Sequence, residues 1–405
     1  MTVAGGSGTA SRSSRRLNWD LIRVVAIVFV MLGHLTGVAA VVPGIEAYPL
    51  ELNIKFGTVT LLVLSGYFIG PTIRRGSAGR WFRHRLARLL PAYLVAVVVV
   101  YTVARLVVVR FNGGTHQDGL LGVLFADPIM PADRGPDALP AWHVPDLTDL
   151  LLHLTLLHEW NPDPWHRIDG SYWTLPVQVI AFAAAALLWR YKLHRRVGAP
   201  VLLWGAMAVS VVSPVLSVIV ETAPTATGAY RAYLFAAGVA IWLWQQRRLS
   251  TTHLVLLLVT TLVIQAFRSG APVALVLLGF AVMLVAMCAA ARGPDWDVPV
   301  LCLVRRPVSW LAGISYSLYL VHQQLGYILA RALSEAGISP WWLRLSIVVG
   351  AVVVAAWLLT VLVERPVHRL LTRRRPRSAA EVTPTVGSST AGSRDAPTVS
   401  VGGAT

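Results

Sequence analysis

Charged side chains are scarce in this sequence of 405 residues. They make up 13% of the chain, whereas 56% of the residues are hydrophobic. A soluble domain usually carries about 25% charged residues, and a water-soluble chain of this length would need more polar surface than this one has. The scarcity therefore excludes a soluble protein and favours a chain whose solvent is lipid.

Cysteines are few, and the sequence indicates neither a signal peptide nor repeats. Two cysteines, Cys288 and Cys302, are too few for a disulfide framework, and we expect both to be inert. We expect no cleavable signal peptide, because residues 1–16 are polar and the first apolar run is too long and contains Arg23 and His34. The sequence has no internal repeat.

Long apolar runs recur along the chain. They predict an all-α integral membrane protein, a bundle of about ten transmembrane helices. The spans are expected at 17–40, 52–73, 87–109, 172–189, 198–220, 230–246, 252–267, 271–291, 308–331 and 341–363. The membrane domain would occupy residues 17–371. It would lie between a cytoplasmic segment at 1–16 and a cytoplasmic tail at 372–405, whose small and polar residues predict disorder.

Positive charge is unevenly distributed over these segments. The net charge of +16 could suggest a nucleic-acid partner. However, most of the 35 Lys and Arg residues fall on the N-terminus, the even-numbered connections and the C-terminal stretch. This asymmetry follows the positive-inside rule, so we expect both termini in the cytoplasm, membrane lipid as a partner and no nucleic acid.

The longest connection, residues 110–171, has the opposite balance. It holds nine acidic residues and three arginines, which is typical of an outer loop. Its Pro and Trp content predicts an ordered loop rather than a linker. The segment 147–158 is apolar but too short to span, so it would lie at the interface or enter the membrane as a re-entrant piece.

Ionisable groups inside a span are costly and therefore informative. Arg23 and His34 are eleven residues apart in the first span, so they share one helix face at about 16 Å along its axis. Asp20 lies one turn before Arg23 and could pair with it. A snorkelling arginine and a hydrogen-bonded histidine would explain the pair without a function. Their alignment on one face favours a functional role.

Further polar groups interrupt other apolar runs. Each has a structural reading, such as helix packing at Ser65 and Gly66 or lipid headgroup binding at the basic cluster of residues 74–88. The alternative reading is a site, since a cationic cluster at the cytoplasmic face can bind phosphates. The remaining candidates are Arg85, Arg88, Tyr93, Trp173, Gln178, Tyr319, His322 and Glu364.

Taken in order, these pieces resemble membrane acyltransferase family 3, the family of O-antigen and other polysaccharide O-acetylases. Arg23 and His34 match its first-helix Arg and His. The sequences LLVLSGY (61–67), RLARLLPAY (85–93), YWTLPVQV (172–179), ISYSLYLVH (314–322) and VERP (363–366) resemble its later motifs. The resemblance runs from about residue 17 to 370. One departure stands out, because Gln178 occupies the position of the family's Glu and cannot act as a base.

The resemblance implies an O-acyltransferase of the bacterial cytoplasmic membrane. Its donor would be acyl-CoA, used as a co-substrate rather than a tightly bound cofactor, and no metal is expected. The acceptor would be a hydroxyl of a cell-envelope glycan, lipid or small molecule. His34 and Arg23 would be catalytic, with His34 as the base. The donor would be held by Arg85, Arg88, Tyr93 and Ser65, and the pocket completed by Trp173, Gln178, Tyr319, His322 and Glu364.

Two other functions fit the same residues. Buried charges also mark the permeation paths of transporters, here a glycan or lipid exporter, although the chain shows no repeat and no paired broken helices. A catalytically silent membrane scaffold or sensor of the same fold is the second alternative, suggested by Gln178. A covalent acyl-histidine relay remains open as a variant of the acyltransferase mechanism.

Overall fold

The computed structural model describes residues 16–52, 54–132, 139–160, 167–219, 226–270 and 272–372. The chain divides into two units, Met1–Thr372 and Arg373–Thr405, and only residues of the first are described. The predicted N-terminal segment, except Arg16, and the predicted tail, except Thr372, therefore lie outside the described residues.

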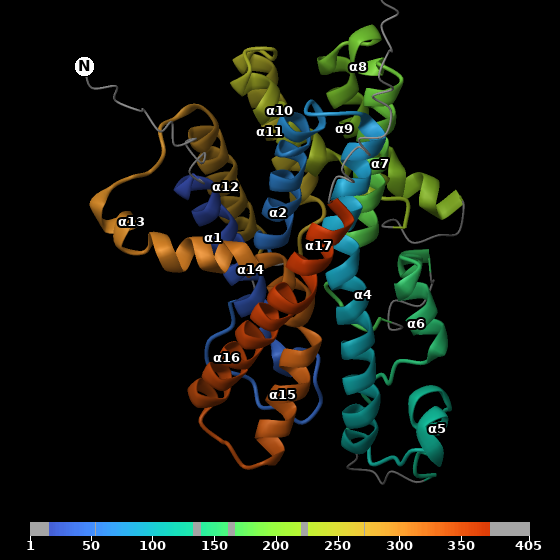
Figure 1. Cartoon of the computed structure of the whole chain (residues 1–405). Helices are drawn as coiled ribbons and strands as arrows, with labels where there is room; N and C mark the ends of the chain where they lie inside the picture. Colours follow the sequence, from blue (N-terminus) through green and yellow to red (C-terminus); the bar gives the residue numbers. More distant parts are fainter. Residues whose placement is uncertain are drawn as a thin grey trace, which may run out of the picture. The chain divides into compact units, whose positions relative to one another are not determined.

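The described residues are helical, as predicted, and their only β contact is an isolated bridge between Thr115 and Ile129. Figure 1 labels the α-helices other than α3. The helices are α1 Leu17–Thr36, η1 Val38–Ala40, α2 Gly57–Tyr67, α3 Ile69–Ile73, α4 Ala78–Phe111, α5 Gly119–Phe125, α6 Leu147–Leu154, η2 His158–Trp160, α7 Thr174–Arg190, α8 Leu193–Arg196, α9 Ala199–Ile219, η3 Ala229–Arg231, α10 Ala232–Gln245, α11 Thr251–Ala266, α12 Val273–Arg292, α13 Pro299–Leu303, α14 Arg305–Val321, α15 Gln324–Glu335, α16 Trp341–Leu359, the π-helical η4 Thr360–Glu364 and α17 Arg365–Thr372.

Within the described ranges, five helices are long and apolar enough to cross a membrane. They are Leu17–Thr36, Ala78–Phe111, Ala199–Ile219, Val273–Arg292 and the continuous stretch Trp341–Thr372. Shorter apolar helices occupy Gly57–Ile73, Thr174–Arg190 and Thr251–Ala266. The protein is therefore a helical membrane protein. Each of the ten expected spans overlaps at least one helix, but the number of spans and the side of each terminus remain predictions.

The expected span at 308–331 is divided into α14 and α15. The break falls at His322 and Gln323. The carboxylate of Asp169 accepts a hydrogen bond from the backbone amide of Gln324 at 2.9 Å. A helix start leaves its first amides without partners, and Asp169 supplies one. The polar interruption thus places His322 at the end of a helix rather than in the middle of one.

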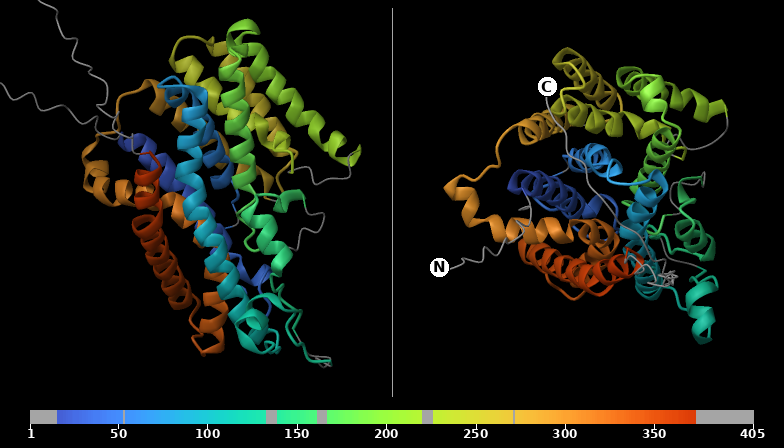
Figure 2. Two further views of the ribbon diagram at one scale, coloured as in Figure 1. Left: turned by 45° about the vertical axis from the view of Figure 1, so that its right-hand side comes forward. Right: turned by 45° about the horizontal axis from the view of Figure 1, so that its top comes forward.

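Helices α1 and α2 form the centre of the bundle. Helix α1 contacts α2, α12 and α14, and α2 packs closely on α10; the right-hand view of Figure 2 shows both blue helices surrounded by later ones. The α2–α10 approach requires small residues, because a side chain at Gly66 or Gly238 would overlap the backbone of the opposite helix. The packing role expected for Gly66 is therefore seen.

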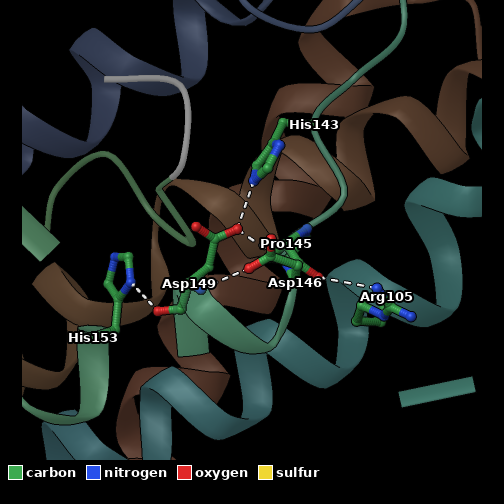
Figure 3. Close-up of polar contacts among 6 residues, drawn as sticks. All are labelled: Arg105, His143, Pro145, Asp146, Asp149 and His153. Atoms are coloured by element: carbon green, nitrogen blue, oxygen red, sulfur yellow. Dashed lines mark hydrogen bonds and ion pairs between the residues drawn. The ribbon is translucent and has the colours of Figure 1, made fainter. Parts of the chain in front are cut away.

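The described part of the connection at 110–171, expected to be an outer loop, is fastened to α4. Arg105 is buried on α4 and donates hydrogen bonds to the carbonyls of Val123, Ala126 and Pro145. Asp146 and Asp149 form a capping box at the start of α6, as Figure 3 shows. Burial lowers the pKa of His153 on the same helix to about 4. The expected re-entrant segment is a short helix packed on α4.

Candidate active site

Two histidines from distant parts of the chain meet in the structure. Nδ1 of His34, near the end of α1, lies 2.8 Å from Nε2 of His322, at the break between α14 and α15. Their rings are nearly parallel, with centroids 5.1 Å apart. His322 is fully buried, whereas His34 is partly exposed to a cavity. The contact between α1 and α14 brings together His34, the expected base, and His322, an expected pocket residue.

The hydrogen-bond partners determine which nitrogen of each ring is the base. Nδ1 of His322 lies 2.9 Å from the carbonyl oxygen of Tyr319, which can only accept, so this nitrogen carries a proton. In a neutral ring Nε2 of His322 is then an acceptor, and Nδ1 of His34 donates to it. The lone pair of His34 is therefore on Nε2, the atom that would take a proton from a substrate.

His34 lines a cavity of about 320 Å³, which we call the histidine cavity. Its wall combines aromatic rings with polar and cationic groups. The residues that matter for its chemistry are His34, Lys55, Ser171, Trp173, Arg231, Arg268 and Tyr319. Among the described residues that line it, none is acidic. The cavity therefore offers a base beside positive charge and a large aromatic surface.

A second cavity of about 250 Å³ lies between α1, α2, α4, α7 and α14, and we call it the arginine cavity. Six of the expected site residues line it: Arg23, Ser65, Arg85, Arg88, Gln178 and Tyr319. No described lining residue is acidic. The guanidinium groups of Arg85 and Arg88, beside Arg23 in the same wall, favour an anionic ligand, because arginine binds phosphate and carboxylate through several hydrogen bonds at once.

Arg85 is held in place by neutral groups. One guanidinium nitrogen donates to the carbonyl of Phe68 at 2.7 Å and to Oγ1 of Thr72 at 2.8 Å. The guanidinium also lies 5.1 Å from the centre of the Phe182 ring and 5.4 Å from that of Trp81. These contacts position the side chain and leave its charge uncompensated by any described carboxylate. The next helical turn carries Arg88, which is exposed.

Gln178 lies in the arginine cavity, as its place in the resembling motif implies. Its side-chain oxygen is 3.5 Å from the Ser65 hydroxyl, which donates its stronger bond to the Leu61 carbonyl at 2.9 Å. A glutamate at this position would bring a negative charge into the same cavity as Arg23 and Arg85. The glutamine leaves the wall cationic and unable to accept a proton.

The two cavities share part of their walls. Thr58 of α2 and Tyr319 of α14 line both. The hydroxyl of Tyr319 donates to the Ser171 carbonyl at 2.9 Å and accepts from Thr174 at 3.2 Å, so its ring is fixed at the boundary. Helix α1 passes both cavities, with Arg23 in one wall and His34 in the other. Arg23 and His34 were predicted to share one helix face, and this is the face that α1 presents to the cavities.

Three expected site residues line neither cavity: His322, which contacts His34, and Tyr93 and Glu364. Tyr93 is fully buried and donates to the carbonyl of His153 at 2.8 Å, which ties α4 to α6. Glu364 is buried in the π-helical segment and accepts a hydrogen bond from Ser317 of α14 at 3.0 Å. The side chains of Tyr93 and Glu364 each join two helices, so their role in this structure is in packing.

Three cationic residues of the histidine cavity were not among the expected site residues. Lys55, Arg231 and Arg268 lie at the ends of the spans expected at 52–73, 230–246 and 252–267. All three fall on the side predicted to be outer, where the positive-inside rule disfavours Lys and Arg. Their exception to that rule is the sequence signal that could have identified them.

A helical bundle with a buried histidine pair and an arginine-lined cavity is the architecture of a membrane enzyme or transporter. The family comparison decides between these classes. Residues 16–361 match the model of the acyltransferase domain, which is nearly the whole membrane unit. The chain therefore belongs to acyltransferase family 3, which confirms the resemblance, and its function is of the acyltransferase type. No curated protein and no solved structure matches the chain.

Proposed function

We propose that the protein transfers an acyl group from an acyl-CoA-type donor to a hydroxyl of a cell-envelope glycan, lipid or small glycoside in the bacterial cytoplasmic membrane. The observation that supports this proposal is the shared wall of two chemically different cavities. One is lined by three arginines and the other by a histidine whose basic nitrogen is determined by its partners. Transfer between two substrates needs two such compartments in contact.

The arginine cavity would hold the donor. Coenzyme A carries several phosphate charges, which suit Arg23, Arg85 and Arg88. On the orientation predicted from the positive-inside rule, this cavity faces the cytoplasm, where acyl-CoA is made. The thioester end of the donor would then point toward Thr58 and Tyr319, at the boundary with the histidine cavity.

The histidine cavity would hold the acceptor. Nε2 of His34 takes the proton of the acceptor hydroxyl, and the oxygen bonds to the thioester carbonyl carbon. The carbon–sulfur bond then breaks, and the departing thiolate takes up the proton. His322 stabilises the intermediate imidazolium, because its Nε2 lone pair accepts the hydrogen bond from His34. The reaction needs no further co-reactant.

The test is acyl transfer by the purified full chain in detergent, with acyl-CoA and an envelope glycan extract. We expect His34→Ala to lose the activity at matched expression. The control is His253→Ala, because His253 is an exposed histidine on α11 that lines neither cavity. Arg23→Ala should raise the apparent KM for acyl-CoA. Full activity in His34→Ala would overturn the proposal, and export of an unmodified acceptor would favour transport instead.

Gln178 supports a second candidate, a catalytically silent membrane scaffold of the same fold. The position of the family's carboxylate is neutral here, although the cavity around it is intact. The variant Gln178→Glu distinguishes the two. New activity in the variant and none in the wild type would favour the scaffold, whereas activity in the wild type favours the enzyme.

A further inference from the structure

The histidine cavity carries more positive charge than proton transfer requires. Besides His34, its wall contains Lys55, Arg231 and Arg268, and none of its described lining residues is acidic. Arg231 and Arg268 are half-buried, and a partly desolvated cation without a negative partner is costly. Cations gathered in a cavity wall are therefore best explained by a ligand that supplies the negative charge.

The two arginines differ in what they contact. Arg268 donates to the carbonyls of Tyr230 and Ser210 and lies 3.7 Å from the centre of the Tyr230 ring. Its hydrogen-bonding groups are largely engaged, so it contributes charge and shape. Arg268 follows the end of α11, ties it to η3 and α9, and lines the cavity.

Arg231 is the less engaged arginine. Its only described side-chain hydrogen bond is a long one, 3.5 Å, to the hydroxyl of Tyr233. Its Nε is buried and has no hydrogen-bond partner among the described residues. The guanidinium lies 5.0 Å from the centre of the Trp173 ring, which also lines the cavity. A buried unsatisfied donor beside a cavity indicates a group that an incoming ligand would satisfy.

We propose that the histidine cavity recognises an anionic sugar, one that bears a carboxylate or a phosphate close to the hydroxyl that is acylated. Arg231 and Lys55 bind the anionic group, and the Trp173 ring packs against the apolar face of the sugar. The inference rests on the proposed function, since it names the class of acceptor. It narrows the glycans, lipids and small glycosides considered above to charged sugars.

The size of the cavity fits this class. Its volume of about 320 Å³ is at the lower end of the usual range for small-molecule sites, about 300–1,000 Å³. It suits one sugar unit rather than a long acyl chain. An uncharged sugar would leave the cations of the wall without a partner, so the cavity should discriminate by charge.

The experiment measures binding to the purified full chain by calorimetry without any acyl donor. The probes are methyl glucuronoside, glucose 6-phosphate, methyl glucoside and glycerol 1-phosphate. We expect one or both charged sugars to bind at least about 10-fold more tightly than methyl glucoside, a difference of about 1.4 kcal/mol. Comparing glucuronoside with glucose 6-phosphate tells whether the anionic group is a carboxylate or a phosphate.

The variants test the residues. Arg231→Gln should remove the preference for charged sugars, and Lys55→Gln should reduce it. Lys55 is exposed, so its replacement should not disturb folding. The matched control is Arg292→Gln, because Arg292 also stacks on a tryptophan, Trp244, but lines neither cavity. It should keep the preference.

Equal binding of charged and uncharged sugars would overturn the inference, as would an unchanged preference in both Arg231→Gln and Lys55→Gln. Binding of glycerol 1-phosphate without either charged sugar would also overturn it, in favour of a lipid headgroup. Because no acyl donor is present, these outcomes are independent of whether the protein transfers an acyl group. Failure of the proposed function would instead appear as absent transfer with the sugar preference intact.

Discussion

His322 has a role that its neighbours define at the level of single atoms. It accepts a hydrogen bond from His34 at 2.8 Å and donates one to the Tyr319 carbonyl at 2.9 Å. This arrangement resembles the way a carboxylate orients a catalytic histidine, with a neutral ring as the acceptor. His322 is therefore a positioning residue in the proposed mechanism, and it acts through His34.

Replacing His322 should lower kcat with little change in KM. We expect His322→Leu to lose about 10²-fold in kcat, because His34 then lacks the acceptor that orients it. His322→Gln should retain more activity, since its side-chain oxygen can accept from Nδ1 of His34. Steady-state kinetics of the two variants check this. Equal rates for leucine and glutamine would contradict an acceptor role and indicate packing alone.

Asp169 provides a prediction about stability. Burial raises the pKa of its carboxyl from 3.8 to about 6, although hydrogen bonds from Ser171 and from the Gln324 amide oppose the shift. Between these pH values the unfolded chain releases a proton that the folded chain keeps. The free energy of unfolding should therefore fall by about 3 kcal/mol as the pH rises from about 4 to 6.

The difference between wild type and Asp169→Asn isolates this effect, because other carboxyl groups titrate equally in both. Thermal unfolding in detergent between pH 4 and 7 should show wild type losing stability relative to the variant as the pH rises. The variant loses the carboxylate oxygen that accepts a hydrogen bond from the backbone amide of Gln324. This loss lowers its stability by an amount that does not change with pH. Parallel pH curves would show that Asp169 does not titrate in this range.

The site was predictable from the sequence where a costly residue interrupts an apolar run. Arg23, His34 and His322 stand out for that reason, and all three lie at the cavities or at the histidine pair. Arg231 and Arg268 did not stand out, because they sit at helix ends, where cations are common. Their place on the side predicted to be outer was the one sequence signal, and the packing of α10 and α11 brings them together at one cavity.

At the scale of helices, α2 and α10 make the most extensive contact among the described helices. A methyl group at Gly238 of α10 would overlap the Val63 carbonyl and the Tyr67 amide of α2. Helix α2 also carries Thr58 and Ser65, which line the cavities. The distance between these two helices therefore determines the shape of the candidate site.

We expect Gly238→Ala to destabilise the protein by about 1–3 kcal/mol through overpacking and to reduce acyl transfer by displacing α2. The control is Gly205→Ala on α9, where an added methyl group meets nothing within 4 Å. That variant should be neutral or more stable by up to about 1 kcal/mol, because alanine favours the helix. Thermal unfolding in detergent gives both values. A stable Gly238→Ala would contradict the close packing.

Element boundaries were harder to predict than element types. Each expected span overlaps a helix, because apolar length is written directly in the sequence. The break after α14 was not predicted, since it depends on Asp169, which is 155 residues away from Gln324. Similarly, residues 80–88 of the basic stretch expected before the third span are part of the continuous helix α4. Such features depend on tertiary contacts that a local pattern does not contain.

At the scale of the whole molecule, the number of spans determines which side each cavity faces. If only the five long helices crossed the membrane, α2 would not span, and residues on either side of it would lie on the same side. With ten spans, α2 returns the chain to the cytoplasm before α4 begins. With a cytoplasmic N-terminus, residue 77 is cytoplasmic if there are ten spans and outer if there are five. Residue 117 is outer with ten spans and cytoplasmic with five.

Single cysteines in intact cells can decide between these topologies, after Cys288 and Cys302 are replaced by alanine. Ten spans predict that an impermeant maleimide labels only the outer group of variants and that the inner group reacts only after permeabilisation, because positive-inside connections face the cytoplasm. All positions are exposed. The outer group is Glu46→Cys, Gln117→Cys and Ala336→Cys, and the inner group is Ser77→Cys, Arg195→Cys, Arg248→Cys and Asp297→Cys. Labelling of Ser77→Cys with protection of Gln117→Cys would instead support five spans. The arginine cavity would then need a donor from the opposite side, which removes acyl-CoA from the proposed mechanism.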